Sequence, residues 1–183
     1  MKKHLPIYIY GVIIILEGIF LLFSINYPFQ TIKLTLGCSL ILGGLLAFIK
    51  TLTRQTKQVE FSYHNIHSFS MLIYGISVLL FAYSIESLIY ISAFLFMFYT
   101  FSEIIFCIWI FNLGKEVVAK IVIIRTLLGL VVGFGTIIIL YYLDEYKPQS
   151  IVGCGILFII IGINILLYVP SVTTKDLPET SKQ

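Results

Sequence analysis

Charged side chains are scarce in this chain. Lys, Arg, Asp and Glu make up 11% of its 183 residues, whereas hydrophobic residues make up 59%. A soluble domain of this length needs far more charge to cover its surface, so this composition excludes an ordinary water-soluble protein. It predicts a protein whose main solvent is lipid.

The chain also lacks the motifs of soluble enzymes and of nucleic-acid-binding proteins. It has no Gly-rich phosphate loop, no H-E-x-x-H, no G-x-S-x-G and no cluster of acidic residues that could hold a metal. We therefore expect no enzymatic activity, no cofactor and no metal. Its Lys and Arg residues form no basic surface, so we do not expect nucleic acid as a partner.

Cysteine and histidine are few and poorly placed for chemistry. Cys38, Cys107 and Cys154 lie inside apolar stretches at no metal-binding or redox spacing, and we interpret them as small buried side chains. His64 and His67, one helical turn apart, could share a metal or sense pH. Unless His4 approaches in space, no third ligand lies near them, so we interpret them as polar residues beside the membrane.

Six long apolar stretches make up most of the chain. Most of them reach the ~20 residues that a helix needs to cross about 30 Å of hydrocarbon, and none alternates as the strands of a membrane barrel do. We predict an all-α membrane protein with six transmembrane helices in residues 1–170, followed by a disordered cytoplasmic tail over 171–183. The stretches run from Ile7 to Ser24, Ile32 to Ile49, Phe69 to Tyr83, Leu88 to Phe111, Ile121 to Leu143 and Ile151 to Val169.

Positive charge is distributed unequally between the connections. Most of it flanks the start of the first stretch and the ends of the even-numbered ones, at Lys2, Lys3, Lys50, Arg54, Lys57, Lys115, Lys120, Lys175 and Lys182. On the opposite side lie only Lys33 and Lys147. By the positive-inside rule, both termini and the even-numbered connections are predicted to be cytoplasmic.

The six stretches form three copies of a helical hairpin. Residues 11–50, 69–108 and 129–168 align without gaps, and the short outer turns between paired stretches predict antiparallel neighbours. Because each copy contains two spans, all copies enter the membrane from the same side, as parallel repeats do. The middle copy diverges most, with Phe69 and Leu95 where its partners have glycine.

Glycine spacing predicts where helices approach one another. Three pairs are seven residues apart, which places each pair on one helix face, and a fourth pair forms a GxxxG. Small residues let helix backbones come close in lipid, where no hydrophobic force drives association. The predicted packing residues are Gly11, Gly18, Gly37, Gly44, Gly129, Gly133, Gly155 and Gly162.

Three ionisable residues, Glu17, Glu103 and Arg125, lie within predicted spans. Each costs at least ~2.5 kcal/mol at such depth unless it is paired or hydrated. We expect all three in the cytoplasmic half of the bilayer at comparable depth, so that they can form a pair or a triad. This is the candidate intramembrane charge site.

Several interpretations of the charge site stay open. It could bind a proton or cation through a desolvated carboxylate, or it could be an internal salt bridge that ties two hairpins together. Arg125 could instead extend to the cytoplasmic surface, and one acid could be neutral and hydrogen-bonded to Asn164, Ser102 or Thr126. We favour the structural role, since one unmatched pair is a thin basis for a transport pathway.

The triplicated hairpin and its glycine framework resemble a known family. The segments YGVIIILEGIFLLFSINYPFQTIKLTLGCSLILGGLLAFI and GLVVGFGTIIILYYLDEYKPQSIVGCGILFIIIGINILL carry most of the likeness. In these the chain resembles the HdeD-like small bacterial membrane proteins, built from a short repeat of unknown function. The resemblance implies six helices and, from the family name, a link to acid resistance. It carries over no catalytic or binding residues.

We therefore expect a non-enzymatic, multi-pass protein of the bacterial cytoplasmic membrane, with a role in acid or stress resistance. The alternative is a small proton-coupled transporter or channel that uses the intramembrane charges. A third interpretation is a scaffold subunit that contacts partners through its glycine faces. The expected partners are the lipid bilayer and either a second copy of this chain or another membrane protein.

Overall fold

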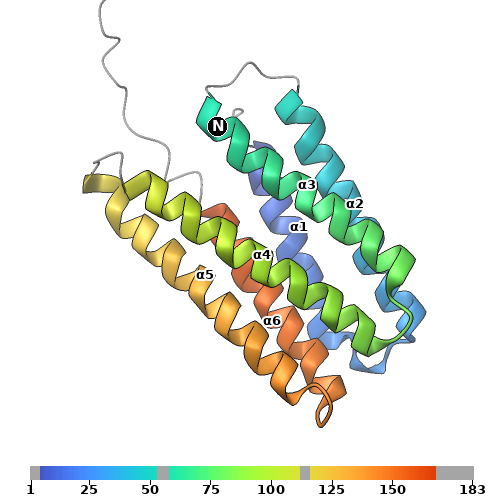
Figure 1. Ribbon diagram of the computed structural model, residues 1–183. Helices are drawn as coiled ribbons and strands as arrows, with labels where there is room; N and C mark the ends of the chain where they lie inside the picture. Colours follow the sequence, from blue (N-terminus) through green and yellow to red (C-terminus); the bar gives the residue numbers. More distant parts are fainter. Residues whose placement is uncertain (1–4, 53–57, 112–115, 168–183) are drawn as a thin grey trace, which may run out of the picture.

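The computed structural model describes residues 5–52, 58–111 and 116–167, and these residues are almost entirely helical. A short 3-10 helix, η1 (Ser24–Asn26), joins the first two α-helices. The predicted all-α class is confirmed. The six α-helices are α1 (Leu5–Phe23), α2 (Phe29–Leu52), α3 (Gln58–Phe81), α4 (Ile85–Phe111), α5 (Glu116–Tyr142) and α6 (Lys147–Leu166) (Figure 1).

Five of these helices contain segments that are long and apolar enough to cross a bilayer. The apolar part of α3 is shorter, Ile66–Phe81, and at 1.5 Å per residue it covers about 24 Å. Among the described residues, five helices therefore have the length and hydropathy of a membrane span, where the sequence predicted six. The five are Ile7–Asn26, Phe29–Phe48, Ile85–Ile108, Ala119–Tyr142 and Lys147–Leu166.

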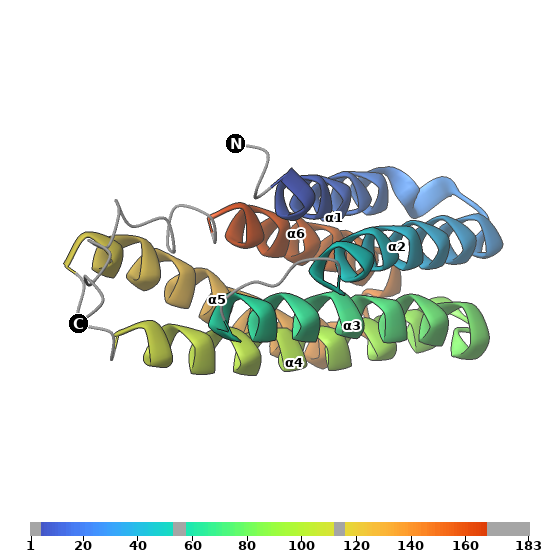
Figure 2. The ribbon, with the colours of Figure 1, turned by 90° about the horizontal axis from the view of Figure 1, so that it is seen from above.

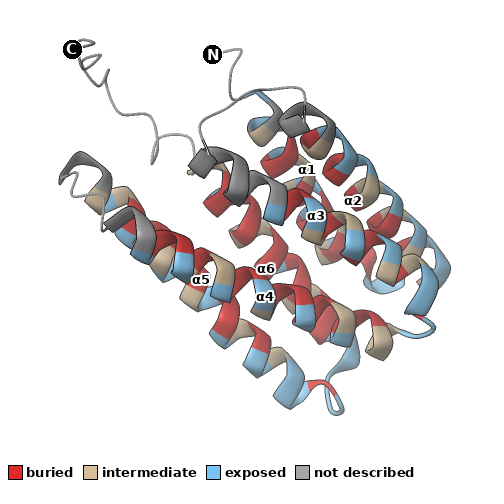
Figure 3. Ribbon diagram, turned by 45° about the horizontal axis from the view of Figure 1, so that its top comes forward, coloured by how far each residue is buried: buried red, intermediate tan, exposed pale blue. Residues whose placement is uncertain are grey.

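The outer surface of the bundle is apolar. Large hydrophobic side chains lie exposed on every helix; those of Leu16, Phe94 and Phe134 are 58%, 77% and 65% exposed. Figure 3 shows that exposed residues face outward while buried ones face the interior of the bundle. Soluble monomers rarely expose apolar surface on this scale, whereas lipid favours it.

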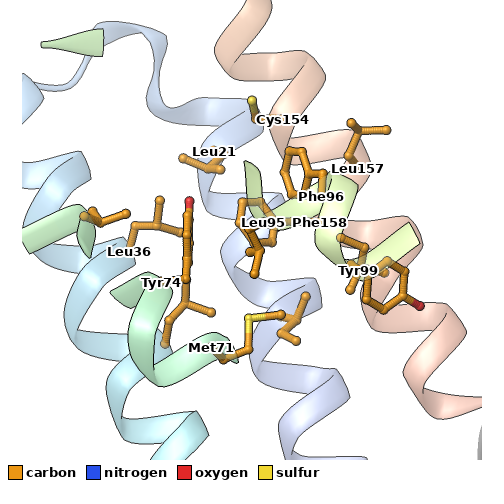
Figure 4. Close-up of a cluster of buried hydrophobic side chains, with 14 of the residues drawn as sticks. Leu21, Leu36, Met71, Tyr74, Leu95, Phe96, Tyr99, Cys154, Leu157 and Phe158 are labelled. Carbon is orange, nitrogen blue, oxygen red and sulfur yellow. The ribbon is translucent and has the colours of Figure 1, made fainter. Parts of the chain in front are cut away.

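The helices share one long direction, as Figures 1 and 2 show. The most extensive contacts join α1 to α6, α2 to α3 and α4 to α5, while α1 and α2, α3 and α4, and α5 and α6 touch less. The bundle core lies between these pairs, where Tyr74, Phe96 and Phe158 meet (Figure 4). The rings of Phe96 and Phe158 pack edge to face with centroids 4.9 Å apart, an arrangement that aromatic pairs prefer.

Glycine brings α1 and α6 into backbone contact. A Cβ atom on Gly155 would lie 2.7 Å from the carbonyl oxygen of Gly18, and one on Gly162 would lie 2.8 Å from that of Gly11. Such an approach is available only to residues without a side chain. Because the earlier glycine of α1 faces the later glycine of α6, the two helices run antiparallel.

The helices α2 and α3 meet in a similar way. A Cβ atom on Gly75 would lie 2.8 Å from the carbonyl oxygen of Gly37, and one on Gly44 would lie 3.1 Å from that of Ser68. The gap-free alignment puts Phe69 at the position of Gly11, but Phe69 is 55% exposed and the neighbouring Ser68 lies at the contact with Gly44. A shift of one residue turns a helix face by about 100°, so the middle copy keeps small residues where its alignment showed none.

The pair α4 and α5 approaches through two glycines of α5. A Cβ atom on Gly129 would lie 3.3 Å from Cγ of Glu103, and one on Gly133 would lie 2.9 Å from Cγ2 of Thr100. The Thr100 hydroxyl donates a hydrogen bond of 3.1 Å to the carbonyl oxygen of Gly129. All eight glycines predicted for packing are buried, and each faces a neighbouring helix of the same chain.

Local signals explain where the helices begin. At the start of α4, the Ser84 hydroxyl accepts a hydrogen bond from the Ser87 N–H at 3.2 Å, and the Ser87 hydroxyl accepts one from the Ser84 N–H at 2.9 Å. This reciprocal cap satisfies backbone donors that the first helical turn leaves unpaired. Pro148 occupies the first turn of α6, where its missing N–H costs nothing.

Candidate functional site

The structure brings Arg125 and Glu103 together inside the bundle. Nη2 of Arg125, on α5, lies 2.6 Å from Oε1 of Glu103, on α4, and both side chains are 0% exposed. A guanidinium cannot lose its proton in a protein, so its charge must be met by an anion or by water. Here a carboxylate on the adjacent helix meets it. The alternative in which Arg125 extends to the membrane surface is wrong.

Further groups surround this ion pair. The Asn164 amide, on α6, donates a hydrogen bond of 3.2 Å to the backbone carbonyl of Arg125, and the Cys107 thiol lies 3.5 Å from Oε1 of Glu103. The guanidinium carbon of Arg125 lies 4.9 Å from the centre of the Phe106 ring, within range of a cation–π contact. The charge pair therefore joins α4, α5 and α6.

The polar region continues towards α3 and α1. The Tyr99 hydroxyl lies within electrostatic range of Glu103 and Arg125 and next to Asn164. The ring of Tyr99 packs against that of His67, on α3, with centroids 5.4 Å apart. Tyr10, on α1, donates a hydrogen bond of 3.4 Å to the backbone carbonyl of His67.

Sequence analysis missed Tyr99 and the role of His67 in this region. The sequence spacing could have indicated Tyr99: it lies four residues before Glu103, which lies four residues before Cys107, so all three share one face of α4. His67 was assigned with His64 to the edge of the membrane, whereas it is 4% exposed and lies inside the bundle. The side chain of His64 lies outside the described residues. In the described part of the chain, no three His, Cys, Asp or Glu side chains are placed to hold a metal ion.

Glu17 does not join Glu103 and Arg125. Its side chain, on α1, is 6% exposed, and its Oε2 atom has no hydrogen-bond partner. The Ser39 hydroxyl, on α2, lies within hydrogen-bonding reach of the same carboxyl group. Tyr74, on α3, is within electrostatic range. Of the pair or triad expected from the sequence, the structure shows the pair, and Glu17 is a separate buried acid.

Charged residues at the opposite end of the bundle are partnered differently. Lys147, at the start of α6, forms a salt bridge with Glu86, at the start of α4, and both side chains are nearly half exposed. The ammonium group of Lys33 lies 5.6 Å from the centre of the Tyr83 ring. Such exposed contacts add little to stability, so they are no counterpart of the buried pair.

An apolar groove opens between α3 and α4. It has a volume of about 430 Å³, and its walls include Tyr74, Tyr90, Phe94 and two hydroxyl groups, those of Ser70 and Ser77. The helices α3 and α4 touch less than the two helices of either other hairpin. The aromatic rim of the groove is part of the exposed apolar surface.

Comparison with known proteins adds no relative. No protein-family model matches the chain, and neither a curated protein nor a solved structure matches it.

Proposed function

We propose that this chain is a non-enzymatic, multi-pass protein of the bacterial cytoplasmic membrane that acts in acid or stress resistance, as its resemblance to HdeD-like proteins implies. Five apolar helices and a lipid-compatible surface support the membrane location. The observation that carries a structural role for the charges is the contact between Arg125 and Glu103. Each neutralises the other in a fully buried position, so the pair holds helices together without needing an ion from solution.

The proposed architecture is a ring of three hairpins with both termini in the cytoplasm. Each hairpin would contact the next through the pairs α2 with α3, α4 with α5, and α6 with α1, which have the most extensive contacts in the structure. Small residues lie at the closest approaches of each pair. The scaffold interpretation loses its basis, because the glycine faces that it assigned to partners are occupied within the chain.

A deletion strain of the source bacterium tests the physiological role. We expect fewer survivors after acid shock when the chain is deleted, and recovery when the wild type or the surface variant Glu86→Gln is supplied. Arg125→Leu should fail to restore survival, because it leaves a buried carboxylate uncompensated. Equal survival of the deletion and parent strains under acid and other envelope stresses would exclude the role.

A second candidate function, proton-coupled transport, is favoured by one observation only. Glu17 is a buried acid with an oxygen that has no hydrogen-bond partner, and such groups mark proton pathways in many membrane proteins. Purified protein in liposomes that contain a pH-sensitive dye distinguishes the candidates. Transport predicts a proton flux that Glu17→Gln abolishes and Glu86→Gln preserves, whereas the structural role predicts no flux from either protein.

A further inference from the structure

Glu17 is a buried acid without a compensating charge. Its side chain is 94% buried, and neither of the two ion pairs in the described part of the chain includes it. Around it, α2 contributes Ser39 and α3 contributes Tyr74, which in turn lies within electrostatic range of Cys154 on α6. None of these three groups is a cation. If Glu17 were ionised, its negative charge would lie in a low-dielectric interior without a cation beside it, and this costs free energy.

The hydrogen bonds of Ser39 indicate which form of Glu17 the site accepts. The Ser39 hydroxyl donates a hydrogen bond to the backbone carbonyl of Thr35 at 2.7 Å. The backbone carbonyl of Leu36, at 3.2 Å, is a second acceptor for the same hydrogen. A hydroxyl has one hydrogen, and here the helix backbone takes it. The oxygen of Ser39 can then accept a hydrogen bond, and a protonated Glu17 carboxyl group can donate it.

Glu103 provides the internal contrast. It has comparable burial, but Nη2 of Arg125 lies 2.6 Å from its Oε1 and supplies the opposite charge. The two membrane carboxyl groups therefore differ in whether a cation lies beside them. Arg125 compensates Glu103, while a proton compensates Glu17.

We propose that Glu17 is a proton-binding site inside the bundle, held as a neutral carboxylic acid that donates to Ser39 and open to modification by apolar carbodiimides. The inference goes beyond the proposed function and does not depend on it. It concerns the form of Glu17 at neutral pH, whether or not protons cross the membrane.

Infrared spectroscopy of the full-length protein in lipid tests the protonation state directly. A protonated carboxylic acid has a carbonyl stretching band that carboxylates and amides lack. We expect this band at neutral pH in the wild type and in Glu86→Gln, and we expect its loss in Glu17→Gln. The glutamine variant keeps the size and polarity of the neutral acid, so it should fold. Absence of the band from the wild type, or its persistence in Glu17→Gln, would overturn the proposal.

Dicyclohexylcarbodiimide offers a second, site-resolved measurement. The carboxyl proton moves to one nitrogen of the reagent while the carboxyl oxygen bonds to its central carbon, and the adduct rearranges to a stable N-acylurea. Peptide mass spectrometry should find the adduct on Glu17 and not on Glu103, with less of it as the pH rises. Labelling of Glu103 in preference to Glu17 would reverse the assignment. No labelling of either, in a protein that shows no acid band, would refute it.

Discussion

The carbonyl oxygen of Gly18 lies so close to Gly155 that a single added carbon on Gly155 would be 2.7 Å away. Gly155→Ala should therefore force α1 and α6 apart and lower the free energy of unfolding by about 1–3 kcal/mol, as overpacking does. Thermal or denaturant unfolding in detergent micelles measures the change.

Gly43 is the matched control for this substitution. It also lies in a buried helix position, but a Cβ atom there would meet Ile13 at 3.4 Å, an ordinary contact distance. Gly43→Ala should be neutral or stabilising, because alanine favours the helix. Equal loss of stability in both variants would mean that backbone contact does not explain the glycines of α1 and α6.

Arg125→Leu should cost about 3–5 kcal/mol, because it leaves the Glu103 carboxylate buried without its partner. Glu103→Gln in the same chain should recover much of this loss, since it removes the stranded charge. A double-mutant cycle measures the coupling between the two positions. Glu17→Gln serves as the reference and should add to Arg125→Leu without coupling. Additivity of Arg125→Leu with Glu103→Gln would contradict the ion pair.

The hydroxyl groups of Tyr74 and Ser92 are 2.7 Å apart and buried between α3 and α4. Tyr74→Phe removes one partner and leaves the ring in place, so it should lower stability by about 0.5–1.5 kcal/mol. Tyr141 is 78% exposed, and Tyr141→Phe should change stability far less. Unfolding measurements on both variants compare the buried and the exposed hydroxyl. A larger loss from Tyr141→Phe would refute this hydrogen bond.

Cysteine labelling tests the proposed topology. In a background without the native cysteines, Glu86→Cys should react with an impermeant maleimide from outside the cell, and Lys120→Cys should react only after the membrane is opened. Glu86 and Lys120 each lie at the start of an apolar segment, and the two segments start at opposite ends of the bundle. The distribution of positive charge predicts that Lys120 is on the cytoplasmic side. The reverse pattern would invert the orientation.

How much of this structure the sequence could predict depends on the physical quantity involved. The length of an apolar run determines where Phe29–Phe48 and Ile85–Ile108 form helices, and this length follows directly from the order of residues in the sequence. Depth in the membrane also follows from position along a helix, so Glu103 and Arg125 could be placed at similar levels. Rotation about the helix axis does not follow from either. It decides that Glu103 faces Arg125 while Glu17 faces Ser39.

The same limit explains the register of α3. A gap-free alignment matches Gly11 and Gly18 with Phe69 and Ile76, yet the contacts with α2 are made one position earlier. Gly75 and Ser68 keep the seven-residue spacing seen in the other copies, but only packing against Gly37 and Gly44 shows that they are the contact positions. Tyr99 could not be assigned to the site for a different reason. A tyrosine in an apolar helix is typical of a core or a membrane interface, and only the structure shows that His67 packs beside it.

The contact between Gly11 and Gly162 has a consequence for how the chain is made. During synthesis α2 meets α3, and α4 meets α5, soon after each enters the bilayer, because these partners are adjacent in the sequence. Of the six described α-helices, α1 is inserted before the others, yet its partner α6 is inserted after them. Until α6 is in the bilayer, Gly11 and Gly18 of α1 therefore lack the helix face that they contact. The contact between α1 and α6 closes a longer loop than any other contact between neighbouring described helices, so we expect it to form last.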